Sequence, residues 1–97
     1  MDLYVILRRC AWRSVAELEE AAARSAKVGD GAMSDDIRWI RSYVPDEGDG
    51  VVGTVCIYEA TGPEKIREHA RMAGLPADEI VPIVDTVVLR PDPAPAG

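Results

Sequence analysis

Two runs of the sequence are apolar at nearly every position, and they constrain the fold more than any other feature. The first is LYVILRR at residues 3–9, and the second is VVGTVCIYEA at residues 51–60. Successive side chains of a β-strand point to opposite faces, so a strand that is apolar on both faces must be covered on both sides. We therefore expect these two runs to be the central strands of one sheet.

A helix is predicted between these strands, over residues 14–29. Ser14 and Glu17 have the spacing of an N-terminal capping box, and Gly29 fits the position just after a helix. Its predicted buried stripe recurs at helical spacing and consists of Val15, Leu18, Ala22 and Ala26.

A second helix is predicted over residues 61–74. Thr61 and Glu64 have capping-box spacing, Pro63 suits the first turn and Gly74 suits the end. The predicted buried stripe contains Ile66, Ala70 and Ala73, which places the only histidine, His69, at the boundary of the buried face.

The remaining segments complete a β-α-β-β-α-β order. Residues 37–44 (IRWIRSYV) alternate like a strand, and residues 45–50 (PDEGDG) have the composition of a solvated hairpin loop. Residues 79–89 read as a last strand, and Pro82 assigns it to an edge because proline cannot donate to a β-ladder.

This order predicts an α+β, ferredoxin-like sandwich with four antiparallel strands and two helices on one face. Residues 1–90 are expected to form a single domain, followed by a disordered tail at residues 91–97. One sheet face would remain without helices although the central strands are apolar on both faces. We therefore expect a homodimer through the open sheet face.

The charge and composition of the chain argue against two classes of binding partner, nucleic acids and membranes. The formal net charge of −6 argues against nucleic acid, which proteins bind by neutralising phosphates with basic residues. The N-terminus has no basic leader, and its apolar run is too short to cross a bilayer. We expect a cytoplasmic protein without a membrane partner, in which Cys10 and Cys56 are reduced thiols.

Four ordered motifs resemble a family of small bacterial ferredoxin-like proteins described as nickel-binding, otherwise a domain of unknown function. The matching positions are Trp39, Ser42, Tyr43 and Val44, then Cys56, Tyr58 and Glu59, then Arg67, Glu68, His69, Gly74, Pro76 and Asp78. The likeness runs from about residue 37 to the last predicted strand. The first loop departs from the family pattern, because this chain has RRCAWRS there, including Cys10 and Trp12.

The resemblance implies that the expected homodimer binds nickel or another divalent transition metal, for sequestration or delivery. The ligand candidates that it implies in this chain are His69, Glu59 and Cys56, since nickel accepts imidazole, carboxylate and thiolate. The candidate pocket-lining residues for a small-molecule ligand are Trp39, Tyr43 and Tyr58.

The residues by themselves leave alternatives open. His69 also fits a hydrogen-bonded helical histidine without a ligand, and Cys56 fits a small buried hydrophobe. A cofactor-independent enzyme of the dimeric α+β barrel type, such as a cyclase, isomerase or monooxygenase, would use His69, Tyr58 and Glu59 as acid–base groups. No motif assigns a catalytic residue or an organic cofactor, so the sequence favours a binding protein over an enzyme.

Overall fold

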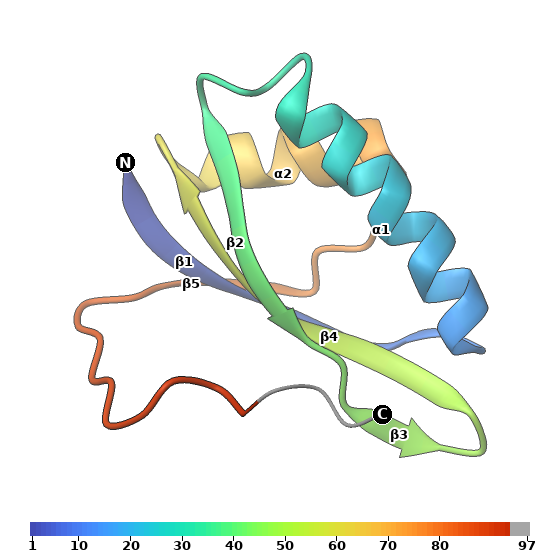
Figure 1. Ribbon diagram of the computed structural model, residues 1–97. Helices are drawn as coiled ribbons and strands as arrows, with labels where there is room; N and C mark the ends of the chain where they lie inside the picture. Colours follow the sequence, from blue (N-terminus) through green and yellow to red (C-terminus); the bar gives the residue numbers. More distant parts are fainter. Residues whose placement is uncertain (94–97) are drawn as a thin grey trace.

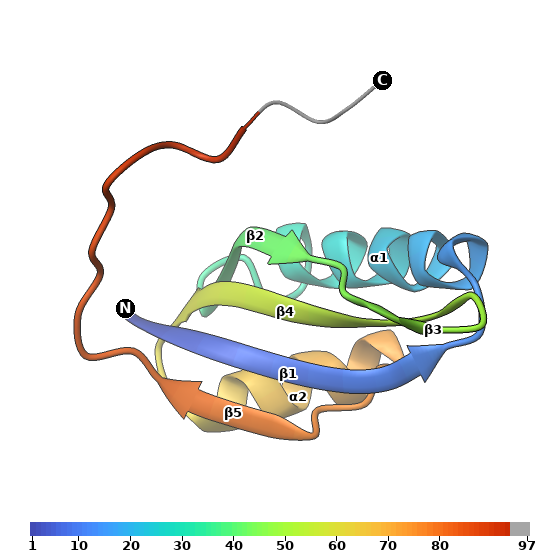
Figure 2. The same cartoon turned by 90° about the horizontal axis from the view of Figure 1, so that it is seen from below.

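An antiparallel sheet is covered on one face by two helices in the computed structural model, which describes residues 1–93 (Figures 1 and 2). The elements in chain order are β1 (Asp2–Trp12), α1 (Val15–Asp30), β2 (Ile37–Tyr43), β3 (Asp46–Gly48), β4 (Val51–Ala60), α2 (Pro63–Ala73) and β5 (Glu79–Pro82). The predicted α+β class, with both helices on one face of an antiparallel sheet, is confirmed.

The strand order is β2-β4-β1-β5, and the short β3 pairs with β4 beyond the end of β2. The two most apolar strands, β1 and β4, are therefore central, as their composition predicted. Pro82 lies in the edge strand β5, opposite Tyr4 of β1. An edge position tolerates the missing backbone N–H of proline, which explains the placement.

The sheet has a fifth strand that the sequence did not predict. Residues 45–50 were expected to be a solvated loop, but Asp46 pairs with Val52 and forms β3. Asp49 and Gly50 have positive φ angles of 55° and 82°, which close a tight turn into β4. The predicted last strand is also shorter than expected, because β5 ends at Pro82.

Helix α1 begins as predicted and differs at its end and on its buried face. The Ser14 hydroxyl accepts a hydrogen bond from the Glu17 backbone N–H at 3.2 Å. The predicted stop at Gly29 is wrong, since the helix continues to Asp30. The predicted stripe is only partly confirmed: Leu18 is buried and Ala22 and Ala26 are half-buried, but Val15 is 53% exposed, and the fully buried positions include Ala21 and Ser25.

Helix α2 ends as predicted but begins differently. Gly74 closes it in the left-handed conformation, with φ 71°. The predicted Thr61 cap is wrong, because Gly62 is the N-cap residue and no side chain caps the helix. The Thr61 hydroxyl donates instead to Asp36 Oδ1 at 3.2 Å.

The core lies between the helices and the inner face of the sheet, in two clusters. The larger one contains Tyr4, Ile6, Met33, Ile37, Cys56, Tyr58, Ala60 and Ile66. The smaller one, at the other end of the sheet, contains Trp12, Leu18, Ala21 and Val52. A cavity lies beside both clusters, because its walls include members of each.

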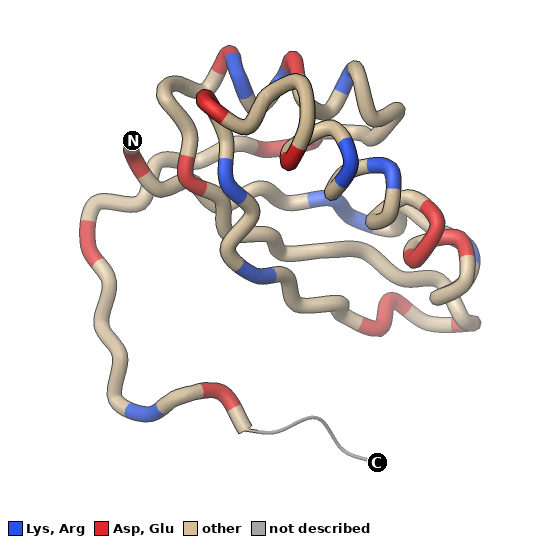
Figure 3. The backbone as a smooth tube through the Cα atoms, turned by 45° about the horizontal axis from the view of Figure 1, so that its top comes forward, with Lys and Arg blue, Asp and Glu red and all other residues tan. Residues whose placement is uncertain are grey.

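The C-terminal segment is described only in part. The predicted tail, residues 91–97, lies mostly outside the described residues; within them, Asp92 contacts β2. None of the described helices is long and apolar enough to cross a membrane. Acidic and basic residues are interspersed over the helices and loops (Figure 3).

Candidate functional site

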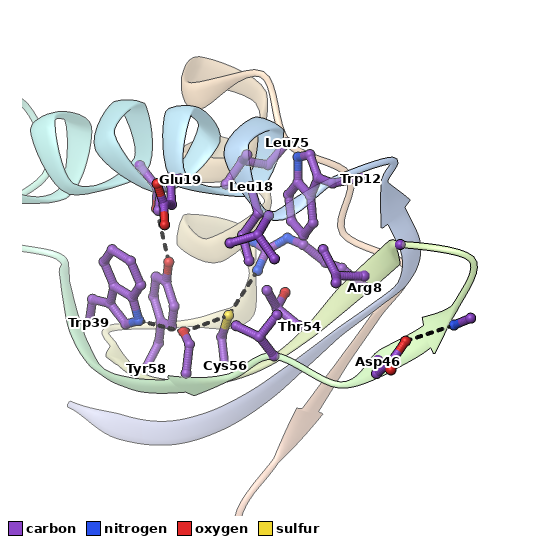
Figure 4. A pocket seen from close by; sticks show the side chains of 18 of the residues that line it. Arg8, Trp12, Leu18, Glu19, Trp39, Asp46, Thr54, Cys56, Tyr58 and Leu75 are labelled. Atoms are coloured by element: carbon purple, nitrogen blue, oxygen red, sulfur yellow. Dashed lines mark hydrogen bonds between the residues drawn. The ribbon is translucent and has the colours of Figure 1, made fainter. Parts of the chain in front are cut away.

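A cavity of about 750 Å³ lies between α1 and the inner face of the sheet (Figure 4). Its walls are Arg8, Trp12, Val15, Leu18, Glu19, Ala22, Ser25, Trp39, Ser42, Val44, Asp46, Gly48, Asp49, Gly50, Val52, Thr54, Cys56, Tyr58 and Leu75. Small-molecule sites are typically about 300–1,000 Å³ and mostly apolar, with a few polar groups. We therefore treat this cavity as the candidate functional site.

Arg8 brings a positive charge into the cavity. It follows Tyr4 and Ile6 on the inner face of β1 and is only 1% exposed. Its Nε donates to the carbonyl oxygen of Pro76 at 2.6 Å, and its Nη1 donates to Cys56 Sγ at 3.3 Å. Its Nη2 has no hydrogen-bond partner among the described residues.

A second polar group without a partner stands beside Arg8. Thr54 of β4 is directly opposite Arg8 of β1 in the antiparallel register, and it is 4% exposed. Side chains opposite one another on adjacent strands have Cβ atoms about 4.5–5.5 Å apart. The Thr54 hydroxyl, like Arg8 Nη2, has no hydrogen-bond partner among the described residues.

A chain of hydrogen bonds leads to Arg8 from Trp39, which together with Tyr58 forms the aromatic wall of the cavity. Trp39 Nε1 donates to Ser42 Oγ at 2.7 Å, and Ser42 Oγ donates to Cys56 Sγ at 2.9 Å. Figure 4 shows this chain continuing from Cys56 to Arg8. The indole of Trp39 stacks on Tyr58 with ring centroids 6.1 Å apart, so the aromatic wall is held in place.

His69 lies behind this wall, in the core. It is 1% exposed, which corrects the predicted boundary position, and its ring meets Tyr58 edge-on at 5.5 Å. Its Nε2 is 2.9 Å from the carbonyl oxygen of Ser25. Burial lowers the pKa of His69 and raises the pKa of Tyr58. Both side chains are therefore neutral near pH 7.

The three predicted metal ligands do not form a cluster in this chain. Glu59 lies next to Tyr58 in β4, so its side chain points to the opposite sheet face from Cys56 and Tyr58. Cys56 contacts Arg8 and Ser42, whereas His69 contacts Ser25. Within residues 1–93, no group of three or more His, Cys, Asp or Glu side chains is arranged to hold a metal ion.

Two of the three predicted pocket residues line the cavity. Trp39 and Tyr58 are in its wall, whereas Tyr43 lies on the open sheet face and bonds to Asp92. Neither Arg8 nor Thr54 is among the site residues that the sequence motifs predict. The alternation of β1 carried a signal for Arg8, because it continues the inward series of Tyr4 and Ile6 at two-residue spacing.

The first five residues of the predicted first loop, where the sequence departs from the family pattern, belong to β1, which ends at Trp12. Glu47 of β3 accepts hydrogen bonds from Arg9 Nη2 at 2.8 Å and from the Cys10 backbone N–H. These contacts lower the pKa of Glu47 to about 2, chiefly through Arg9. Trp12 follows on the inner face and contributes to the cavity wall.

Comparisons with known proteins place the chain in a family. A crystal structure of SCO4226 from Streptomyces coelicolor A3(2) has the same fold, with a TM-score of 0.71 at 17% sequence identity. The match covers 88% of this chain and 99% of that one. No curated protein matches the chain. The model of a family described as "Nickel responsive protein SCO4226-like" matches residues 4–83. This chain therefore belongs to the SCO4226-like family of nickel responsive proteins.

Proposed function

We propose that the protein is a homodimer with a ferredoxin-like fold that binds nickel or a similar divalent transition metal, for sequestration or delivery. Support for the metal comes from the description of the family to which the chain belongs. Support for a binding role over an enzymatic one comes from the acid–base candidates. Of His69, Tyr58 and Glu59, only Tyr58 lines the cavity.

The observation that best supports a metal ligand is the hydrogen bonding of His69. A carbonyl oxygen can only accept a hydrogen bond, so Nε2, which faces the Ser25 carbonyl, must carry the ring proton. Nδ1 then holds a lone pair, and it has no hydrogen-bond partner among the described residues. Metal-bound histidines commonly donate their other N–H to a carbonyl or carboxylate in this way.

Because Cys56 and Glu59 do not converge on His69, the proposed site needs ligands besides these three. His69 is also almost fully buried, so an ion can reach Nδ1 only when α1 and α2 separate locally. The proposal therefore includes slow metal uptake, coupled to opening between the helices.

The test is elemental analysis of untagged protein, followed by nickel, copper and zinc titrations. The His69→Gln variant removes the proposed ligand, and Glu59→Gln and Cys56→Ala test the other two candidates. Near-stoichiometric metal that is lost in His69→Gln, with an unchanged circular dichroism spectrum, is the expected result. Binding no stronger than that of surface carboxylates in the wild type would overturn the proposal.

The proposed homodimer is supported by the open face of the sheet. Residues 83–93 leave the sheet after β5 and return to β2, where Asp92 pairs with Arg41 at 2.9 Å. A second cavity of about 630 Å³ lies between this segment and the open face. The apolar residues of the segment are far more exposed than is usual: Val84 is 99%, Val87 79%, Val88 72% and Leu89 88% exposed.

A second copy of the chain is the occupant that fits this face. Its own open face and terminal segment would cover the same kind of apolar surface, and a two-fold axis makes both contacts at once. Light scattering coupled to size exclusion is expected to give a dimer for the wild type. Ile57→Arg, which places a charge on the open face, is expected to give a folded monomer. Glu64→Arg on α2 is the control and should remain dimeric.

A monomeric wild type at a concentration of tens of micromolar would overturn the dimer. Metal binding by such a monomer would still be measurable, so the two parts of the proposal can fail separately.

A further inference from the structure

Arg8 is a buried cation that has no anionic partner among residues 1–93. No carboxylate lies within the 4.0 Å ion-pair distance of its guanidinium among the described residues, whose ion pairs involve Arg9, Arg41 and Lys65. Its contacts are a carbonyl oxygen and a thiol, which do not neutralise the charge. Burying an unpaired charge is costly, so such a group is expected to have a counterion in the functional state.

The free donor of Arg8 has a matching neighbour. Arg8 and Thr54 are paired across β1 and β4 and line the same cavity, and Arg8 Nη2 and the Thr54 hydroxyl both lack partners among the described residues. A carboxylate has two acceptor oxygens, so one can accept from the guanidinium and the other from the hydroxyl. A bound carboxylate would thus satisfy both groups and neutralise Arg8.

The walls around this polar pair are apolar and aromatic. The side chains of Trp12, Leu18, Trp39 and Tyr58 line the cavity together with Arg8 (Figure 4). We propose that the cavity binds an organic monocarboxylate with an aromatic or branched apolar body, whose carboxylate lies between Arg8 and Thr54. This site is separate from the proposed metal ligand His69, which does not line the cavity, and it depends on neither metal binding nor dimerisation.

The charges of the cavity select a monoanion. Arg8 is the only Lys or Arg side chain in its described wall, while the acidic residues Glu19, Asp46 and Asp49 are also part of that wall. These three residues are exposed and stand at the mouth, so they would repel a second negative charge on the ligand. A phosphate ester would also find too few donors, because Nε and Nη1 of Arg8 are already engaged.

The test compares two probes of nearly the same shape, indole-3-acetate and the uncharged indole-3-acetamide. Calorimetric titration of the full chain at pH 7 is expected to show that the acid binds about tenfold or more tightly than the amide. This factor follows from the usual contribution of a hydrogen bond to a charged group. In ¹⁵N-labelled protein, the acid should shift the indole N–H signals of Trp12 and Trp39, which both line the cavity.

Three variants test whether the preference for the acid depends on Arg8 and Thr54. Arg8→Met keeps the apolar stem and removes the charge, so it should lose the preference for the acid while binding the amide within about twofold of the wild type. Thr54→Val should reduce acid affinity about threefold to tenfold, as expected for one hydrogen bond. Arg13→Met removes an exposed arginine and should change neither affinity.

Each contrary result has one meaning. Equal binding of acid and amide to the wild type, absence of binding at millimolar probe, or binding without a shift of either indole signal would overturn the proposal. An acid preference that persists in Arg8→Met would do so as well. If Arg8→Met does not fold, the comparison of acid and amide binding to the wild type and to Thr54→Val still tests the proposal.

Discussion

Acidification below about pH 6.5 is expected to destabilise the protein through His69. His69 is the only histidine in the chain, and burial lowers its pKa in the folded state below the ordinary value of 6.5. Between the folded and unfolded pKa values the unfolded chain binds more protons, so the free energy of unfolding falls as the pH falls. The contribution of His69 is therefore complete above about pH 6.5 and is lost progressively below it.

The change in the free energy of unfolding is limited because His69 takes up only one proton. Each pH unit within the window changes the free energy of unfolding by at most about 1.4 kcal/mol. Summed from pH 7 to pH 5 with an ordinary unfolded pKa, the limit is about 2 kcal/mol. A smaller lowering of the folded pKa gives less than this limit, and we expect a change of about 1 kcal/mol. With a urea dependence of about 1–2 kcal/mol per molar, the unfolding midpoint should fall by roughly 0.5–1 M.

The assay is urea unfolding at pH 7, 6 and 5, followed by circular dichroism, for the wild type and His69→Gln. Glutamine retains an N–H donor for the Ser25 carbonyl but does not titrate. Its midpoint should be lower than that of the wild type at pH 7 and should change little down to pH 5. Equal pH dependence of the two proteins would refute the reasoning, because it would show that other groups bind the protons.

Two further predictions concern packing and the β1–β3 contact. Gly53→Ala should destabilise the protein by about 1–3 kcal/mol, because a Cβ at this position would clash with the Arg8 backbone carbonyl. Gly29→Ala is the control: its Cβ would meet nothing nearer than 3.7 Å, so the substitution should be neutral or stabilise the protein by up to about 1 kcal/mol. Thermal unfolding of the pair checks this, and equal effects would contradict it. Glu47→Gln should lower stability above pH 4.5, with the difference from wild type vanishing as the pH falls through about 2, since the folded pKa lies below the unfolded one. Urea midpoints at pH 7 and pH 3 measure this, and a difference that does not shrink at pH 3 would contradict the role of the Arg9 pair.

The order and type of the long elements followed from local sequence patterns. The two-sided apolar runs became the central strands, and Pro82 marked an edge, because these signals depend only on side-chain alternation and on the missing N–H of proline. Ser14 caps the start of α1 and Gly74 closes the end of α2, as predicted, because a cap is a contact between near neighbours in the chain.

Tertiary structure decided what surrounds each residue. The helical wheel placed His69 at a boundary, but α1 packs against α2 and buries it against Ser25. Strand alternation by itself puts Glu59 and Cys56 on opposite faces of β4, but only the packing of both helices on one side decides that the face of Cys56 is the covered one.

The cavity itself depended on the register between β1 and β4. Arg8 and Thr54 are 46 positions apart in the printed sequence, and only their pairing across the two strands makes them neighbours. The sequence by itself determined which segments are strands and helices, because alternation, helical periodicity and caps act over a few residues. Only the tertiary structure decided that a buried arginine and a threonine face the same cavity, each with one polar group that lacks a partner within residues 1–93, because that depends on contacts between distant segments.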